Sequence, residues 1–167
     1  MPPTGKGRWD DSNRHLQCHR RGAQRTAHTE NAAVRAVLDT NVVMSAIFFG
    51  GIPLKIIRAA FSKKVELVSS KAVLAEYREV AERLHVQFPS VNYRRPLAIL
   101  ESKLTIVKPV ALGEVVCRDP DDDAILACAL GGNAKVICSG DGDLLTLDGF
   151  RGLEIMPPAD FCQRMQL

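Results

Sequence analysis

The sequence predicts an α/β protein with a three-layer α-β-α architecture around a parallel sheet of four or five strands. Short runs rich in β-branched residues alternate with longer segments whose apolar residues recur at helical spacing. Strands that are separated by helices pair in parallel, because each crossover returns the chain to the same end of the sheet. The 167 residues suffice for one domain with its own core, plus an appendage.

Residues 1–33 are predicted to be a disordered, basic N-terminal extension. Leu16 is their only large aliphatic residue, so they cannot bury enough apolar surface to offset the ordering entropy. They hold six of the 22 basic and three of the 19 acidic residues, which leaves sixteen of each sign in residues 34–167. The net charge of +3 therefore belongs to the extension, which could also lie upstream of the true start. Its HLQCH stretch (15–19) has no second ligand pair nearby, so no metal site is expected there.

The first half of the body, which begins at residue 34, alternates strands and helices. The β-branched runs at 33–39 and 65–70 are predicted strands. Helical spacing marks four segments, which are 42–48, 53–64, 71–85 and 95–104. The helix at 71–85 has the clearest apolar face, and Ser69 or Ser70 can cap it.

The second half of the body continues this alternation with shorter elements. Residues 105–110 are a weak strand or a connector. The helix at 119–132 has Asp119 as a suitable N-cap, Pro120 at its first position and two glycines at its end. Four short elements follow, which are a strand at 135–140, a helix at 143–147, a strand at 153–158 and a helix at 158–165.

The composition is that of a soluble globular protein, with 46% hydrophobic and 25% charged residues. No apolar run approaches the roughly 18 to 20 residues that span a bilayer. The N-terminus lacks the apolar core of a secretory signal. The five cysteines are an odd number and lie far apart, which favours reduced thiols in a cytoplasmic protein.

Acidic residues recur where the predicted strands end. Asp39 ends the first strand, and Asp141 and Asp143 follow the strand that contains KVICS. Glu76 lies in the longest helix, and residues 119–123 supply four aspartates at the start of a later one. Ligands of open α/β sheets bind beyond the carboxyl ends of the strands, so these acids are expected to meet at one edge.

Each acid also has a purely structural explanation. Asp39 could be a turn residue, with Thr40 and Asn41 as capping groups, and Asp141 and Asp143 could form a turn with the glycines beside them. Glu76 could be a solvated partner of the basic residues beside it. The aspartates of the later helix could favour its dipole. Asp123 differs because it lies one turn into that helix beside apolar residues, where an unpaired carboxylate is unfavourable.

A cluster of these acids would favour a divalent cation. Two unit charges 4 Å apart repel by about 1 kcal/mol in water and about 4 kcal/mol at an effective dielectric constant of 20. A chain that tolerates several such contacts either protonates one acid or binds a cation. Oxygen ligands without sulfur or imidazole favour Mg²⁺ or Mn²⁺. The body contains one histidine, His85, so a zinc site is not expected there.

Four motifs in order resemble the PIN-domain ribonucleases. They are LDTNV at 38–42, Glu76 in a helix after a serine-containing strand end, DPDDDAILACAL at 119–130 and CSGDGDLL at 138–145. The resemblance covers about residues 34–160 and is closest to VapC-like toxins of toxin–antitoxin systems. It implies a PIN-like fold with an acidic pocket at the C-terminal edge of the sheet.

The resemblance also implies roles for particular residues. The catalytic acids would be Asp39, Glu76, Asp123 and Asp141, and these would bind Mg²⁺ or Mn²⁺, with Asp143 sharing or taking the role of Asp141. The supporting polar residues would be Thr40, Asn41 and Ser139. Asp119 matches an acid that is often present upstream of Asp123, so either of these two could point inward.

The activity that this resemblance implies is metal-dependent endoribonuclease cleavage of RNA. Basic side chains that could contact phosphates are Lys55, Lys63, Lys64, Arg94 and Arg95. The expected partners are the RNA substrate, a small cognate antitoxin and a second copy of the chain in a homodimer, with no membrane.

Two other functions remain open on the residues alone. A phosphatase that forms an aspartyl phosphate begins with D-x-D, but here the first strand ends Asp39-Thr40-Asn41 and the second acid is missing. A non-catalytic RNA-binding domain of the same fold would not need four acids in order.

Overall fold

The computed structural model describes residues 33–167, so the predicted extension lies outside this part except for its last residue. Within the described residues, five parallel strands form one sheet in the order β3-β2-β1-β4-β5. The strands are β1 (Val34–Leu38), β2 (Val65–Ser69), β3 (Thr105–Ile106), β4 (Val136–Cys138) and β5 (Glu154–Met156). The predicted α/β architecture is confirmed, with five strands.

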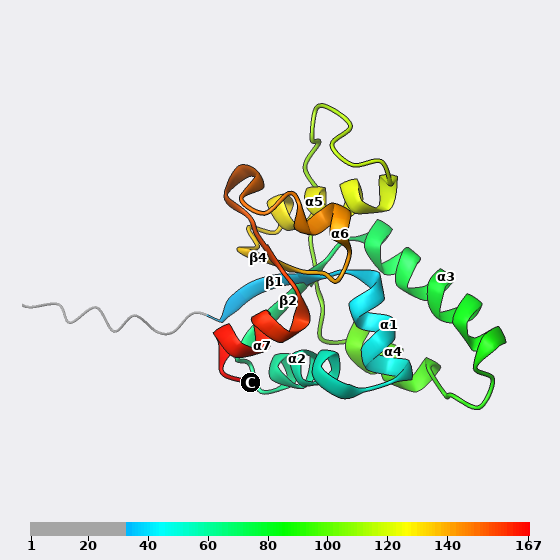
Figure 1. Cartoon of the computed structure of the whole chain (residues 1–167). Coiled ribbons are helices and arrows are strands. Elements are labelled where there is room, and N and C mark those ends of the chain that lie inside the picture. The colour runs from blue at the N-terminus through cyan, green and yellow to red at the C-terminus, as the bar shows by residue number, and fades with distance from the viewer. Residues whose placement is uncertain (1–32) are drawn as a thin grey trace, which may run out of the picture. The chain divides into compact units, whose positions relative to one another are not determined.

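Helices cover both faces of this sheet. They are α1 (Thr40–Phe48), α2 (Gly51–Phe61), α3 (Lys71–Gln87), α4 (Arg94–Glu101), α5 (Pro120–Gly131), α6 (Gly142–Leu145) and α7 (Pro158–Met165), with a short 3₁₀ helix η1 (Phe150–Gly152). Figure 1 shows α2 and α7 on one side of the sheet and α5 on the other, which makes three layers. Of the two serines before α3, Ser70 is the N-cap, and its hydroxyl accepts a hydrogen bond from the Val73 N–H.

Residues 105–110, expected to be a weak strand or a connector, form a two-residue strand that is followed by a connector. Thr105 and Ile106 pair with β2, and the Val107 N–H still donates to the Ser69 carbonyl of β2. Pro109 has no N–H to give to a ladder, and the Val110 N–H donates to the carbonyl of Ala127 in α5 instead. The segment therefore leaves the sheet early and packs against a helix.

The core lies on both sides of β1 and β4. Its largest fully buried side chains include Leu38, Tyr77, Ile125, Leu126, Ile137, Leu144 and Phe161. The four cysteines of the described part (Cys117, Cys128, Cys138 and Cys162) are all buried free thiols. Within residues 33–167 no single helix is long and apolar enough to cross a membrane, although α1 and α2 together reach that length and composition across a 99° bend.

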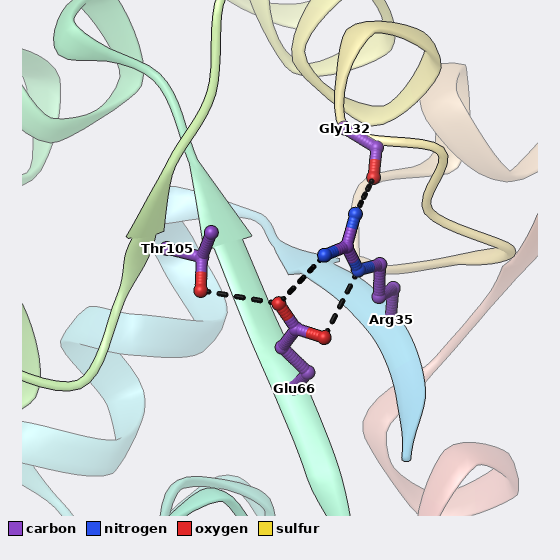
Figure 2. A network of polar contacts seen from close by, with 4 residues as sticks. All are labelled: Arg35, Glu66, Thr105 and Gly132. Atoms are coloured by element: carbon purple, nitrogen blue, oxygen red, sulfur yellow. Dashed lines mark hydrogen bonds and ion pairs between the residues drawn. The ribbon is translucent and has the colours of Figure 1, made fainter. Parts of the chain in front are cut away.

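A polar network ties three neighbouring strands together and links them to the end of α5 (Figure 2). The Glu66 carboxylate on β2 accepts two hydrogen bonds from Arg35 on β1, at 2.9 and 3.0 Å, and one from the Thr105 hydroxyl on β3. A third guanidinium N–H of Arg35 donates to the carbonyl oxygen of Gly132 at 3.0 Å. The pKa of Glu66 is lowered, chiefly by its hydrogen bonds to Arg35.

Candidate active site

An acidic pocket of about 380 Å³ lies at the point in the sheet where the order of the strands reverses. The chain runs from β1 outward to β2 and β3, and then returns to the other side of β1 to add β4 and β5. The crevice between β1 and β4 is therefore the switch point at which open α/β sheets bind ligands. Seven carboxylates line the pocket, from Asp39, Glu76, Glu79, Asp119, Asp121, Asp122 and Asp141.

Asp39 is held at the centre of a chain of hydrogen bonds. It follows β1 and is the N-cap of α1, where its carboxylate accepts from the Asn41 N–H at 3.3 Å. Its other oxygen accepts from the buried Ser139 hydroxyl, which follows β4, at 2.7 Å. The Ser139 oxygen in turn accepts from the Asp141 N–H at 2.9 Å. These bonds join the ends of β1 and β4 and bring Asp39 and Asp141 to the same pocket.

Two buried oxygen atoms in the pocket have no hydrogen-bond partner among the described residues. They are the Thr40 hydroxyl and one oxygen of the Glu76 carboxylate. Thr40 is only 2% exposed. The next residue after Glu76, Tyr77, is fully buried and donates its hydroxyl hydrogen bond to the Leu38 carbonyl, which holds α3 against the end of β1. Buried polar atoms without partners indicate a site that is completed by something else.

The first turn of α5 turns Asp122, and not Asp123, toward the pocket. Asp122 lines the pocket. The carboxylate of Asp123 instead accepts hydrogen bonds from the backbone N–H groups of Cys117 and Val116, at 2.8 and 3.3 Å. The structure therefore does not bring Asp123, a predicted site residue, to this pocket. Successive side chains on a helix point in directions about 100° apart. Asp123 therefore points toward the loop before α5, whose backbone N–H groups donate hydrogen bonds to it.

The other predicted acids divide between the pocket and the surface. Asp119 caps α5 by accepting from the Asp121 N–H, and both residues line the pocket. Asp141 lines the pocket and caps α6, with the Asp143 N–H as donor. Asp143 itself is exposed and lines a different depression beside Cys117. Of the two acids after β4, the structure brings Asp141 to the pocket.

The electrostatics of the pocket raise the pKa values of three of its acids. Burial raises the pKa of Asp39, partly offset by the hydrogen bond from Ser139. Burial also raises the pKa of Glu76, and the charges of nearby aspartates add to the effect. The neighbouring Thr40 hydroxyl lowers this pKa, although the two groups do not meet the geometry of a hydrogen bond. The pKa of Asp122 rises to about 6, first through burial and then through the charges of Asp141 and Asp39. Burial and the charges of the neighbouring acids therefore make the ionised form of these carboxyl groups less favourable than in water.

The donor chemistry of the pocket fits a hard divalent cation. Among the residues that the structure describes, no three potential ligands lie close enough together to hold an ion as they stand. The acidic lining nevertheless offers carboxylate oxygens, two buried oxygens lack partners within this described part, and burial and mutual repulsion raise carboxyl pKa values. A cation would relieve each of these features.

The predicted basic residues do not reach this pocket. None of the five (Lys55, Lys63, Lys64, Arg94 and Arg95) lines it, and Arg94 forms an ion pair with Glu82. The sequence interpretation missed Asp122 and Arg83, which do line it. Helical spacing would have found both, because Asp122 lies three residues after the N-cap Asp119 and Arg83 lies two turns after Glu76.

Comparison with known proteins gives one match to a family and a similarity of fold. The sequence matches the family model described as PIN domain over residues 35–143, which is more than half of the chain. The fold is similar to the crystal structure of PAE2754 from Pyrobaculum aerophilum, with a TM-score of 0.55 and 14% identity over 81% of this chain and 92% of that chain.

A further solved structure is similar to a lesser degree. It is VapBC2 from Rickettsia felis bound to a DNA fragment from their promoter, with a TM-score of 0.46 and 17% identity over 73% of this chain and 97% of that chain. A search of curated proteins gives no match. At these identities, likeness to solved structures establishes the fold alone.

Proposed function

The chain belongs to the PIN domain family, and from this premise we propose that it is a metal-dependent endoribonuclease that acts as the toxin of a toxin–antitoxin pair. The single observation that carries the nuclease proposal is the convergence of Asp39, Glu76, Asp122 and Asp141 on one pocket at the sheet switch point. These acids come from four separate segments of the chain.

The cation in this proposal is Mg²⁺ or Mn²⁺, held by Asp39, Glu76, Asp122 and Asp141. When bound, such an ion polarises a phosphodiester oxygen and lowers the pKa of a bound water. The chain's own residues prepare the site for it. Ser139 and the Asn41 N–H fix the orientation of Asp39. The amino end of α5, close to Asp122, adds positive potential near the substrate.

The reaction that we propose is hydrolysis of an RNA phosphodiester bond. The oxygen of water bonds to phosphorus, the bond from phosphorus to the 3′-oxygen breaks, and that oxygen leaves as a hydroxyl with a proton. Thr40 and Glu76 line the pocket, where the Thr40 hydroxyl can donate a hydrogen bond and the Glu76 carboxylate oxygen can accept one. Asp123 has no part in this reaction, because its carboxylate holds the loop before α5.

Cleavage of single-stranded RNA with Mg²⁺ or Mn²⁺ tests the proposal. We expect Asp39→Asn and Asp122→Asn each to lower the rate by about 10²-fold or more, the range for removing a group that acts at the reacting centre. Asp123→Asn should keep most of the wild-type rate, since the amide oxygen can still accept the shorter of the two backbone hydrogen bonds, from the Cys117 N–H, and only the longer bond from the Val116 N–H is lost. Gel analysis of end-labelled RNA measures all three variants.

Several outcomes would contradict parts of this proposal. Cleavage that continues in the presence of a chelator would show that the reaction does not require a metal ion. If Asp123→Asn were inactive and Asp122→Asn active, Asp123 and not Asp122 would be the metal ligand. RNA binding without any cleavage would indicate a non-catalytic domain of the same fold.

The toxin role rests on the resemblance of the sequence motifs to VapC-like toxins, and it has its own test. Induced expression in a bacterial host should arrest growth, and Asp39→Asn should not. Unimpaired growth on expression of an active nuclease would leave the ribonuclease proposal standing and remove the toxin role.

A further inference from the structure

One face of helix α3 runs along the acidic pocket beyond the proposed metal ligands. The pocket-lining residues of α3 follow the spacing i, i+3, i+4, i+7, i+8 and i+11, and they are Ala72, Ala75, Glu76, Glu79, Val80 and Arg83. Such spacing places them on a single side of the helix. The two alanines carry small side chains, which leave the groove open beside Glu76. The pocket therefore extends along α3 from the proposed catalytic centre to Arg83.

Arg83 is the only basic residue that lines this pocket in the part of the chain that the structure describes. Its side chain is exposed, and no described carboxylate lies within ion-pairing distance of it. This matters because Glu79 lies four residues earlier on the same face, a spacing that commonly gives a Glu–Arg pair. Arg78, on another face of α3, does pair with Glu101. The Arg83 guanidinium is thus available to an external anion.

We propose that Arg83 binds a phosphate of the RNA strand next to the phosphate that is cleaved. This inference rests on the proposed function and adds a substrate-positioning residue to it. A polyanion that enters a pocket lined by seven carboxylates needs a fixed positive charge besides the cation, and Arg83 provides one. A guanidinium suits this role because its planar N–H groups match two phosphate oxygens.

The position of Arg83 along the helix assigns it to a neighbouring phosphate. Arg83 lies seven positions after Glu76, which corresponds to about 10 Å along the helix axis. Glu76 lies among the acids of the proposed catalytic centre, so Arg83 lies beyond the reacting phosphate. It is a positioning residue, and its removal should weaken binding of the strand more than it slows the chemical step.

The salt dependence of RNA binding tests this role. The probe is a fluorescein-labelled oligouridylate, and the protein carries Asp39→Asn so that it does not cleave. On a plot of log Kd against log salt concentration, Arg83→Gln should reduce the slope by about 0.7, because one fewer phosphate of the single strand is neutralised. Arg83→Lys should keep the slope because it keeps the charge. Arg58→Gln is the matched control, since Arg58 is exposed on α2 and lies outside the pocket.

Cleavage kinetics provide the second readout. With Asp39 restored, Arg83→Gln should raise KM and leave kcat near the wild-type value. A slope and a KM that do not change in Arg83→Gln would overturn the inference while leaving the nuclease proposal intact. An equal effect in Arg58→Gln would also overturn it, because the effect would then be one of overall charge. A wild-type protein that neither binds nor cleaves RNA would overturn both proposals.

Discussion

At the scale of single residues, Asp122 is an acid of the pocket whose pKa is raised well above its usual value. Burial and the charges of Asp141 and Asp39 raise its pKa to about 6, whereas an aspartate in the unfolded chain titrates near about 3.9. Between these two values the folded protein binds more protons than the unfolded chain. The free energy of unfolding contributed by Asp122 therefore increases as the pH falls from about 7 to about 4.

This linkage predicts the behaviour of Asp122→Asn in the presence of a chelator. The variant should be more stable than the wild type near neutral pH, because it lacks the unfavourable charge. The difference should shrink to nothing as the pH falls to about 4 and below, where the wild-type carboxyl becomes protonated in both states. Urea unfolding across this pH range measures it. Asp160→Asn, an exposed acid on α7, is the control, and a difference independent of pH would contradict the assignment.

At the scale of elements, helix α5 is tied at both ends. Its amino end is held to the preceding loop by Asp123, and the Gly132 carbonyl at its carboxyl end accepts a hydrogen bond from Arg35. Near that end Gly131 packs so closely on the segment after β3 that a Cβ there would collide with the Lys108 carbonyl oxygen. These contacts set the rotation of the helix, and the rotation decides that Asp122 lines the pocket.

The close approach at Gly131 gives a prediction for stability. Gly131→Ala should lower the free energy of unfolding by about 1–3 kcal/mol, because the backbone of Lys108 and Pro109 must move to admit the methyl group. Gly142→Ala is the matched control, since no atom lies within 4 Å of the Cβ it would add. Urea unfolding measures both variants. Equal stability of Gly131→Ala and Gly142→Ala would show that the segment after β3 can move to admit the methyl group without a cost in free energy.

At the scale of the whole molecule, the pocket couples folding to cation binding. The acids come from the ends of β1 and β4 and from α3 and α5, so they meet only in the folded chain. A cation that binds these acids binds the native state and not the unfolded chain, and it should therefore stabilise the fold.

We accordingly expect Mn²⁺ or Mg²⁺ to raise the melting temperature. At a hundredfold excess over its dissociation constant, a ligand that binds only the native state adds about 2.7 kcal/mol. Asp39→Asn should remove most of this response, and Asp160→Asn should retain it. Calorimetry with added metal and with chelator measures the shift. An unchanged melting temperature in the wild type would contradict a cation site formed by these acids.

The sequence alone determined the parallel α/β fold and most of the acids that line the pocket. Alternating strand and helix patterns are local properties, and the rule that parallel strands end at one edge places Asp39 and Asp141 together without any coordinates. For residues 105–110 the sequence left a weak strand or a connector open, and in the structure Pro109 and a hydrogen bond to α5 end the strand after two residues.

Only the tertiary structure decided which neighbouring side chains face the pocket. Asp122 and Asp123 have the same chemistry, and the choice between them depends on the rotation of α5, which distant contacts at Gly131 and Gly132 control. Arg83 is likewise free to bind an external anion because, in the described part of the chain, it does not form an ion pair with Glu79. Local sequence sets the period of a helix, but its rotation against the sheet is set by packing between segments far apart in the chain.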